Sequence, residues 1–371
     1  MKGPIAKRTR RAFISKLKKI LSNTVKSEAP PEHLLKNKMQ VKWKRYLTLK
    51  KDKSHFSKTE KRENILAPIE IDYYDPKNYH KTNVFLMKLR KLVLDRKKNV
   101  CINFKVTKKI TASAMISFLA EVDTLISRSP LGRNCITFTH PKKEKVESIL
   151  KQIGFYELLR KPCRNTKDFD DVAYWNYASG AHTDTQQASE AMREIELKIS
   201  QKAQRKLYKG FSEAMANCVE HAYYGDNTQN DNCTKWWAFA GVKENILVVV
   251  ICDKGIGIPV SLPLTRKDEI IESFKNLLKL RKLNDSAMIK IASQMGRTRT
   301  KQGNRGKGLK DIKAIIDSLN EGMLTIYSNK GYYRYFRNNM KLDDSRKEHK
   351  SSVCGTIVEW AIPLTADALE S

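Results

Sequence analysis

Apolar positions in the first half of the chain follow two alternating patterns. Residues 100–104 and 135–138 are short apolar runs of the kind that form buried strands, whereas residues 112–126 and 142–153 carry apolar side chains at helical spacing. Because strand-like and helix-like segments alternate, we predict a small α/β domain over residues 65–165.

A second set of elements is predicted toward the C-terminus. Residues 188–208 have the pattern of a long amphipathic helix, and we expect Gly210 to separate it from a second helix that begins near Ser212. Residues 245–252 are apolar and β-branched, which predicts a central strand. The remaining expected elements are a helix over residues 309–319 and strands over residues 324–328 and 355–360. We assign residues 166–371 to one α/β domain.

The first group of candidate chemical residues is Glu213-x-x-x-Asn217-x-x-x-His221. Residues four apart lie on one face of a helix, so these three polar side chains are expected together. An Asn side-chain oxygen can coordinate Mg²⁺, and a nearby carboxylate can orient or deprotonate a water or hydroxyl. Taken alone, the spacing is also typical of a polar surface helix.

The second group follows the apolar run and reads Asp253-Lys-Gly255-Ile-Gly257. The two glycines allow a sharp turn and a close approach of the backbone to a flat ring. A carboxylate beside that turn can accept a hydrogen bond from an exocyclic amine such as that of adenine. By itself, Asp-x-Gly-x-Gly is often only a loop.

The third group is a glycine loop that leads into the helix predicted at 309–319. Such a loop offers free backbone N–H groups and the positive end of a helix dipole, which suit phosphate. It does not match the P-loop pattern. The residues that we assign to nucleotide binding here are Gly303, Arg305, Gly306, Lys307, Gly308 and Leu309.

In this order, the three groups resemble the GHKL ATPase superfamily, and Glu213 to Tyr223 is most similar to its anti-sigma-factor serine kinase branch. The resemblance implies a Bergerat fold, an α/β sandwich with helices over one face of a mixed sheet, with ATP and Mg²⁺ as ligands. It assigns Glu213 as catalytic base and Asn217 as the magnesium ligand, with His221 in the same motif. Asp253 would bind the adenine amine, Gly255 and Gly257 would form the adenine turn, and Thr356 would lie behind the adenine.

The same resemblance implies that Gly303, Gly306 and Gly308 line the triphosphate. The sequence departs from the family pattern at Asn304 and Lys307, and residues 259–302 form a long basic segment that we expect to be a mobile ATP lid.

The α/β segment at 65–165 resembles a STAS domain, the fold of anti-sigma-factor antagonists. The similarity lies in the strand ending near Phe104, the loop and helix opening at 111–113, and Gly154-Phe155 closing the last helix. In that family a serine at the helix start accepts phosphate, and Ser113 takes this place. Lys108 and Lys109 precede it instead of the usual acidic residue, so a capping or packing role is the alternative.

The net charge of the chain indicates a possible polyanionic binding partner. The chain carries a formal charge of +31, and much of the excess lies in residues 1–64, which we treat as a basic N-terminal extension. Residues 13–21 have the pattern of a short basic amphipathic helix, and residues 42–46 mix cations with aromatics, which suits phosphates and stacked bases. The segment is expected to bind nucleic acid or another polyanion, or to act as a solubilising tail.

Seven cysteines are scattered without a Cys-x-x-Cys pair, and no apolar run approaches the roughly 18 residues that span a bilayer. We therefore expect a cytoplasmic protein without a membrane span. The leading hypothesis is an enzyme that hydrolyses ATP or transfers its phosphate, and that couples nucleotide state through the lid to a protein partner or a homodimer. The alternatives are a nucleic-acid-binding regulatory or defence module with ATP as a conformational ligand, a serine kinase acting on a STAS-like domain, and a fold that no longer turns over nucleotide.

Overall fold

The computed structural model describes residues 62–167, 169, 173–180, 201–223, 235–243, 245–295, 308–339 and 341–364. Residues 62–371 form one compact unit. The basic N-terminal extension up to residue 61, including the helix and aromatic cluster expected there, lies outside the described residues. Among the helices of the described ranges, none combines the length and the apolar character that a membrane crossing requires.

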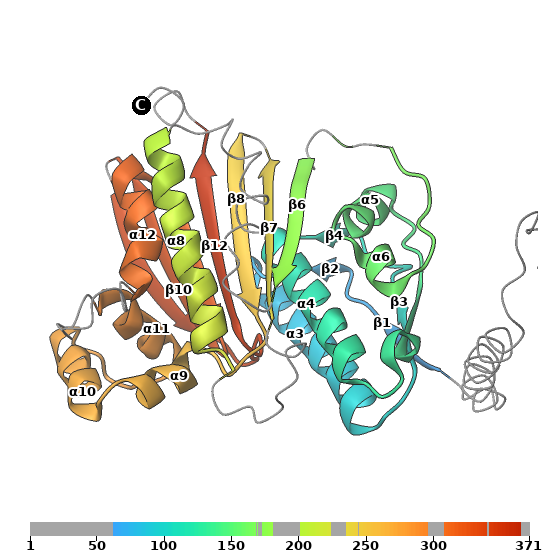
Figure 1. Cartoon of the computed structure of the whole chain (residues 1–371), viewed down its shortest axis with the longest axis horizontal. Coiled ribbons are helices and arrows are strands. Elements are labelled where there is room, and N and C mark those ends of the chain that lie inside the picture. Colours follow the sequence, from blue (N-terminus) through green and yellow to red (C-terminus); the bar gives the residue numbers. More distant parts are fainter. Residues whose placement is uncertain are drawn as a thin grey trace, which may run out of the picture. The chain divides into compact units, whose positions relative to one another are not determined.

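A seven-stranded sheet organises the C-terminal region (Figure 1). Its strands, in the spatial order β11-β10-β9-β12-β8-β7-β6, are β6 (Ala173–Gly180), β7 (Trp236–Lys243), β8 (Ile246–Asp253), β9 (Glu321–Ser328), β10 (Gly331–Asn338), β11 (Lys341–Glu348) and β12 (Thr356–Pro363). The strands predicted at 245–252, 324–328 and 355–360 are confirmed as β8, β9 and β12.

The mixed sheet that we expected is wrong for the described strands, because all their pairings are antiparallel. A short connection explains the difference for the pairing of β9 with β10. Only Asn329 and Lys330 separate β9 from β10, and Asn329 has a φ of 49°. A two-residue turn joins antiparallel neighbours, whereas parallel neighbours need a long crossover.

Five helices of the C-terminal region contribute to a hydrophobic core with one face of this sheet (Figure 1). They are α8 (Gln201–Glu220), α9 (Ile258–Thr265), α10 (Asp268–Leu277), α11 (Asp285–Gln294) and α12 (Gly308–Leu319). The helix predicted at 309–319 is confirmed as α12. Its Leu309, Ile312 and Ile316 recur at helical spacing and are all buried.

The break predicted at Gly210 is wrong, because α8 runs through it without interruption. Gly210 instead allows α8 to lie close to α12. A Cβ at this position would be 3.2 Å from the carbonyl oxygen of Asp311 and 3.6 Å from the ring of Trp360. The glycine is thus a helix-packing residue, which its sequence context alone does not distinguish from a helix stop.

The segment predicted as a mobile lid is largely helical. Within residues 259–302, the described part up to Met295 contains most of α9 together with α10 and α11. Ala287, Ile289 and Ile291 of α11 are fully buried in the core beneath the sheet. The apolar side chains of α11 therefore form part of the packed interior, while a lid movement of residues 259–302 stays a prediction.

The α/β region predicted at 65–165 is confirmed as alternating strands and helices. A three-stranded parallel sheet contains β1 (Glu63–Leu66), β3 (Val100–Asn103) and β5 (Ile136–Thr139), and a two-stranded parallel sheet contains β2 (Glu70–Ile71) and β4 (Lys109–Ile110). The helices are α3 (Pro76–Arg90), α4 (Ala112–Arg128), α5 (Glu144–Gln152) and α6 (Phe155–Leu159), with a π-helical turn at Lys91–Asp95 and a 3-10 turn at Gly132–Cys135. Gly154 ends α5 as expected, but α6 follows it.

This α/β region covers the second face of the seven-stranded sheet. Helix α4 packs against β7, β8 and β12, and the region shares one hydrophobic core with that face. The residues that the sheet and its loops contribute to the shared core are Trp237, Phe239, Val250, Cys252, Tyr327, Val353 and Ile357. The sheet is consequently buried on both faces, with the C-terminal helices on one side and α4 on the other.

Candidate functional site

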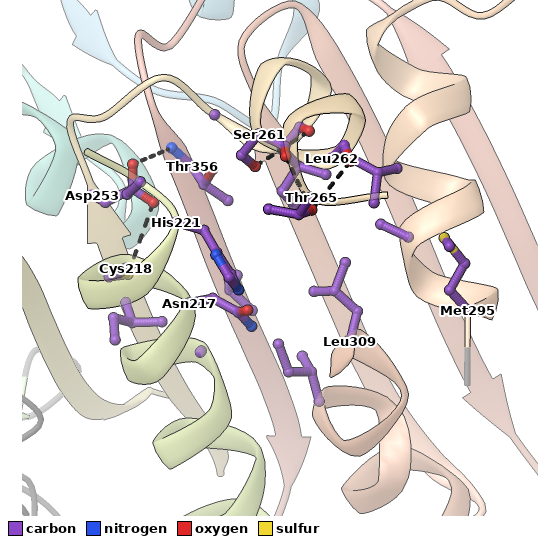
Figure 2. A pocket seen from close by; sticks show the side chains of 18 of the residues that line it. Asn217, Cys218, His221, Asp253, Ser261, Leu262, Thr265, Met295, Leu309 and Thr356 are labelled. Atoms are coloured by element: carbon purple, nitrogen blue, oxygen red, sulfur yellow. Dashed lines mark hydrogen bonds between the residues drawn. The ribbon is translucent and has the colours of Figure 1, made fainter. Parts of the chain in front are cut away.

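A cavity of about 120 Å³ lies between helices α8, α9, α11 and α12 and the strands β8 and β12 (Figure 2). Residues from all three sequence groups reach it. The predicted site residues that line it are Asn217, His221, Asp253, Gly257, Leu309 and Thr356. Segments separated by more than a hundred residues in the sequence therefore meet at one site.

Asp253 provides a buried carboxylate in this cavity. It is 4% exposed. Its Oδ1 accepts hydrogen bonds from the main-chain N–H of Gly255 at 2.9 Å and of Thr356 at 3.2 Å. The thiol of Cys218 lies 3.8 Å from Oδ2, a long and weak contact that leaves this oxygen with acceptor capacity. Burial raises the pKa of Asp253 to about 6, against the lowering effect of the two N–H donors.

The turn after Asp253 has no room for side chains at its two glycines. A Cβ on Gly255 would lie 1.9 Å from the carbonyl oxygen of Ala222, which already accepts from the N–H of Ile256 at 2.7 Å. Gly257 has a φ of 78°, and a Cβ there would lie 2.7 Å from the side-chain nitrogen of Asn329. The turn is thus held tightly against the end of α8, beside the cavity.

Thr356 joins the ends of two strands to the start of α9. Its hydroxyl lies 3.0 Å from that of Ser328 on β9. Ser328 Oγ in turn accepts from the N–H of Ile258, the first residue of α9, at 2.8 Å. These contacts connect β9 and β12 to the start of α9, and both Thr356 and Ile258 line the cavity.

Helix α8 places the first sequence group along one side. Asn217 and His221 are half-buried, and Figure 2 shows both side chains projecting from α8 toward the space between the strands and α12. The main-chain N–H of His221 donates to the carbonyl oxygen of Asn217 at 3.1 Å, which extends the helical turn beyond Glu220. Glu213 lies one turn before Asn217 and is not among the residues that line the cavity.

The third sequence group is only partly described. Gly308 is the first residue of α12, and Leu309 places an apolar side chain in the cavity wall. Gly303, Arg305, Gly306 and Lys307 lie outside the described residues. The described part therefore brings the N-terminus of a 12-residue helix to the cavity.

Several of the residues that line the cavity were not identified from the sequence. Cys218 follows Asn217 directly, Ser261 and Thr265 come from α9, and Met295 follows α11. One signal for α9 was present, because the helix begins directly after Gly257 and Pro259 stands in its first turn. For Met295 no comparable local signal exists, because its position depends on the packing of α11.

Ser113, the candidate phosphoacceptor, lies on the other side of the sheet. It is fully buried in the first turn of α4, and its hydroxyl donates to Oε2 of Glu359 on β12. Glu359 also accepts from the hydroxyl of Tyr74 at 2.9 Å. In this structure Ser113 has a packing and hydrogen-bonding role between α4 and the sheet.

Comparison with known proteins adds no family assignment. A scan against protein-family models and a search of curated proteins both find no match to this chain. The functional interpretation consequently rests on the residues of the cavity and on their geometry.

Proposed function

We propose that the chain binds Mg-ATP in this cavity and hydrolyses it or transfers its γ-phosphate. The observation that carries the proposal is the buried Asp253. Its Oδ1 is held by two main-chain N–H groups, while Oδ2 keeps acceptor capacity in a cavity with largely apolar walls. A carboxylate in that setting is suited to recognise an exocyclic amine on a flat ring, as in adenine.

The residues around Asp253 fit an adenine nucleotide. Gly255 and Gly257 remove the Cβ atoms that would crowd the turn. Thr356 supports the carboxylate from β12. Leu309 and Met295 offer apolar surface to a ring. This combination of apolar walls and a few fixed polar groups is typical of small-molecule sites.

Two further elements would serve the phosphates and the metal. The side-chain oxygen of Asn217 would be a ligand for Mg²⁺, which commonly takes its other ligands from phosphate and water. The N-terminus of α12 would favour the negative triphosphate through its free N–H groups, and the resemblance adds the glycine loop before it. When bound, Mg²⁺ would neutralise charge on the phosphates.

Glu213 is the proposed general base. On α8 it stands four residues before Asn217, which is about 6 Å along the helix axis. A carboxylate at that position would orient a water, or a serine hydroxyl of a protein substrate, toward the γ-phosphate and accept its proton.

The test compares Mg-ATP affinity and turnover of the wild-type chain with Glu213→Ala and Asn217→Ala. Glu220→Ala is the matched control, because Glu220 is an exposed glutamate at the end of the same helix. We expect Glu213→Ala to keep ATP but to lose turnover, by a factor of roughly 100 or more. Asn217→Ala should lose the magnesium-dependent part of the affinity, and Glu220→Ala should behave as wild type.

ATP labelled at the γ-phosphate separates the two reactions. Release of free phosphate indicates hydrolysis, and label retained on protein indicates a kinase. Equal turnover in all four chains would remove the role of Glu213, and absence of Mg-ATP binding to the wild type would end the proposal.

The strongly basic N-terminal extension favours a second function, nucleic-acid binding with ATP as a conformational ligand. Phosphate-dominated binding weakens steeply with salt, because counterions are released when the complex forms. A filter-binding titration of single- and double-stranded nucleic acid between about 50 and 200 mM salt should show this dependence. Absence of binding at low salt would leave an acidic protein partner as the alternative.

A further inference from the structure

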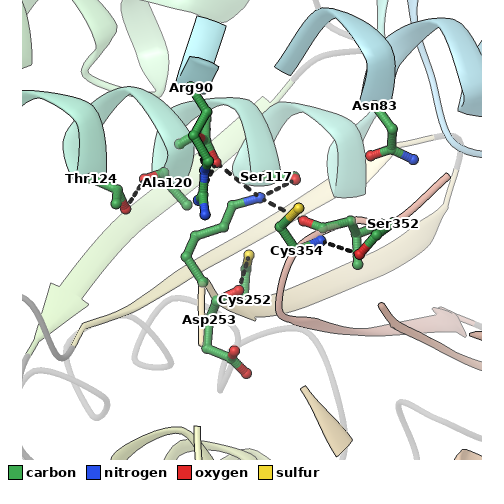
Figure 3. Close-up of polar contacts among 12 residues, drawn as sticks. Asn83, Arg90, Ser117, Ala120, Thr124, Cys252, Asp253, Ser352 and Cys354 are labelled. Atoms are coloured by element: carbon green, nitrogen blue, oxygen red, sulfur yellow. Dashed lines mark hydrogen bonds and ion pairs between the residues drawn. The ribbon is translucent and has the colours of Figure 1, made fainter. Parts of the chain in front are cut away.

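Asp253 and the next residue, Lys254, are directed to opposite sides at the end of β8. Successive side chains along a strand point to opposite faces of the sheet. Asp253 faces the cavity, whereas the Lys254 side chain is buried beneath α4. In Figure 3 the Asp253 carboxylate points away from Arg90 and Ser117. The buried lysine and the carboxylate of the candidate site are thus neighbours in the chain on opposite faces of the sheet.

Lys254 is held by groups from two segments. Its Nζ donates to Ser117 Oγ on α4 at 2.8 Å and to the carbonyl oxygen of Val353 at 3.1 Å. It also lies 3.9 Å from Oε2 of Glu121 on α4, and both of these side chains are 2% exposed. A lysine this deeply buried needs such partners, because an unpaired charge in the interior is strongly destabilising.

Glu121 is fixed in turn by Arg90 at the end of α3. The Nε and Nη2 atoms of Arg90 each donate to one carboxylate oxygen of Glu121 at 2.8 Å. This two-point contact gives the carboxylate a defined orientation. A continuous chain of contacts, Arg90–Glu121–Lys254, thus connects the α/β region to the residue next to Asp253.

The polar contacts of α4 lie on one face of the helix. Ser113, Ser117 and Glu121 are spaced by four residues, which places them in a row. Ser113 contacts Glu359 of β12, and the other two contact Lys254. Helix α4 therefore contacts both strands that contribute to the candidate site, from the face opposite the cavity.

We infer that Lys254 is a positioning residue for the turn 253–257, and that the α/β region regulates nucleotide affinity from within the same chain by holding Lys254 through Ser117 and Glu121. This inference rests on the proposed function. A buried ion pair is weak evidence for stability, since apolar residues of similar volume often serve as well. Its specific effect here is to fix α4 in register with the turn, so that a shift of α4 moves Asp253.

The test uses Lys254→Met, Glu121→Gln and the double variant, with Lys254→Arg as the charge-conserving variant. Asp123→Asn is the matched control. Asp123 also joins α4 to the sheet, through Lys235 at 3.2 Å and the indole N–H of Trp237 at 3.0 Å, and neither of these two partners belongs to the turn 253–257. Thermal unfolding establishes the temperature at which every variant is folded.

Two properties are then measured on the full chain. The first is the Kd for Mg-ATP by calorimetry. The second is the rate at which Cys218 is alkylated without nucleotide, followed by mass spectrometry of its peptide. Cys218 lines the cavity, 6% exposed and in contact with Asp253, so its reaction rate reports the geometry of the turn independently of ATP.

We expect Lys254→Met to weaken Mg-ATP binding by about tenfold, within the range usual for coupled sites, and to accelerate Cys218 alkylation several-fold. Glu121→Gln should change both in the same direction, and the double variant should change them by less than the sum of the single variants. Lys254→Arg should show a Kd for Mg-ATP and a Cys218 alkylation rate much closer to wild type than those of Lys254→Met. Asp123→Asn should lower the melting temperature without changing either one.

Two results would overturn the inference. One is a folded Lys254→Met chain with wild-type affinity and alkylation rate, and the other is an equal change in Asp123→Asn. If Lys254→Met does not fold, Glu121→Gln and Lys254→Arg decide the question by the same readouts. If the wild-type chain does not bind Mg-ATP, the proposed function fails, whereas the Cys218 rates still test the positioning role.

Discussion

The main-chain N–H of Thr356 donates to Oδ1 of Asp253 at 3.2 Å and so ties the start of β12 to the end of β8. Together with the N–H of Gly255, it orients a carboxylate that is almost completely buried. Burial has the larger effect on protonation and raises the pKa of Asp253 to about 6. The Asp253 carboxylate, which we assign to recognition of adenine, consequently titrates close to neutral pH.

The first prediction concerns the pH dependence of ATP binding. Only the ionised Asp253 accepts fully from an amine, so affinity should be maximal above pH 7 and fall as the pH drops through about 6. At pH 5 the Kd should be about tenfold weaker, because about a tenth of the unliganded protein then carries the ionised form. Calorimetry at several pH values measures this change.

Asp253→Asn is the control for this titration, since it keeps an acceptor for the two N–H groups but cannot ionise. Its binding should be weak and independent of pH between 5 and 8. A wild-type Kd that stays constant over the same range would contradict the assignment of Asp253.

The second prediction concerns the turn beside the cavity. In Gly255→Ala, the new Cβ would lie 1.9 Å from the carbonyl oxygen of Ala222, so the backbone has to move. We expect at least a tenfold loss of ATP affinity and a loss of roughly 2–4 kcal/mol in the free energy of unfolding. Denaturant titration and calorimetry measure the two effects.

Gly132→Ala provides the comparison for this glycine substitution. Gly132 has a φ of 52°, but a Cβ there would meet no atom within 4 Å. Gly132→Ala should lower the free energy of unfolding by only about 1–2 kcal/mol, the cost of backbone strain, and should leave ATP affinity unchanged. Equal affinities in the two alanine variants would argue against a role of the turn in binding.

The third prediction concerns the packing of α12 on the sheet. Trp360 is fully buried on β12, and its indole N–H donates to the carbonyl oxygen of Ile312 at 2.8 Å. Trp360→Phe removes this hydrogen bond and leaves a small void, so the unfolding free energy should fall by about 2–4 kcal/mol. Leu277→Ala, at a side chain that is 73% exposed, should change it by less than about 0.5 kcal/mol. Similar losses in both variants would show that Trp360 is not a packing anchor.

The sequence predicts a helix or strand well where that element buries one face, because its apolar residues then recur at a regular spacing. In α12, the spacing of Leu309, Ile312 and Ile316 identifies the helix and its buried side. Strand β11, by contrast, has the sequence KLDDSRKE and was missed. It is an edge strand with a polar surface, and its conformation follows from pairing with β10 rather than from its own pattern.

The candidate site was predictable to the extent that its residues lie in short motifs. The structure brings Asn217, Asp253 and Thr356 to one cavity, as the ordered motifs suggested. The wall formed by α9 and α11 was not predicted, because residues 259–302 are basic and their helices depend on burial against the sheet. No local signal in the sequence indicated Lys254, since its partners Ser117 and Glu121 lie more than a hundred residues earlier.

Because α4 covers one face of the sheet, the C-terminal region is difficult to study as a separate fragment. A fragment starting at residue 166 would leave Trp237, Phe239 and Tyr327 without their apolar neighbours and Lys254 without its counter-charge. Such a truncated chain should be poorly soluble and prone to aggregate. The halves are better separated by point substitutions at α4 than by cutting the polypeptide between them.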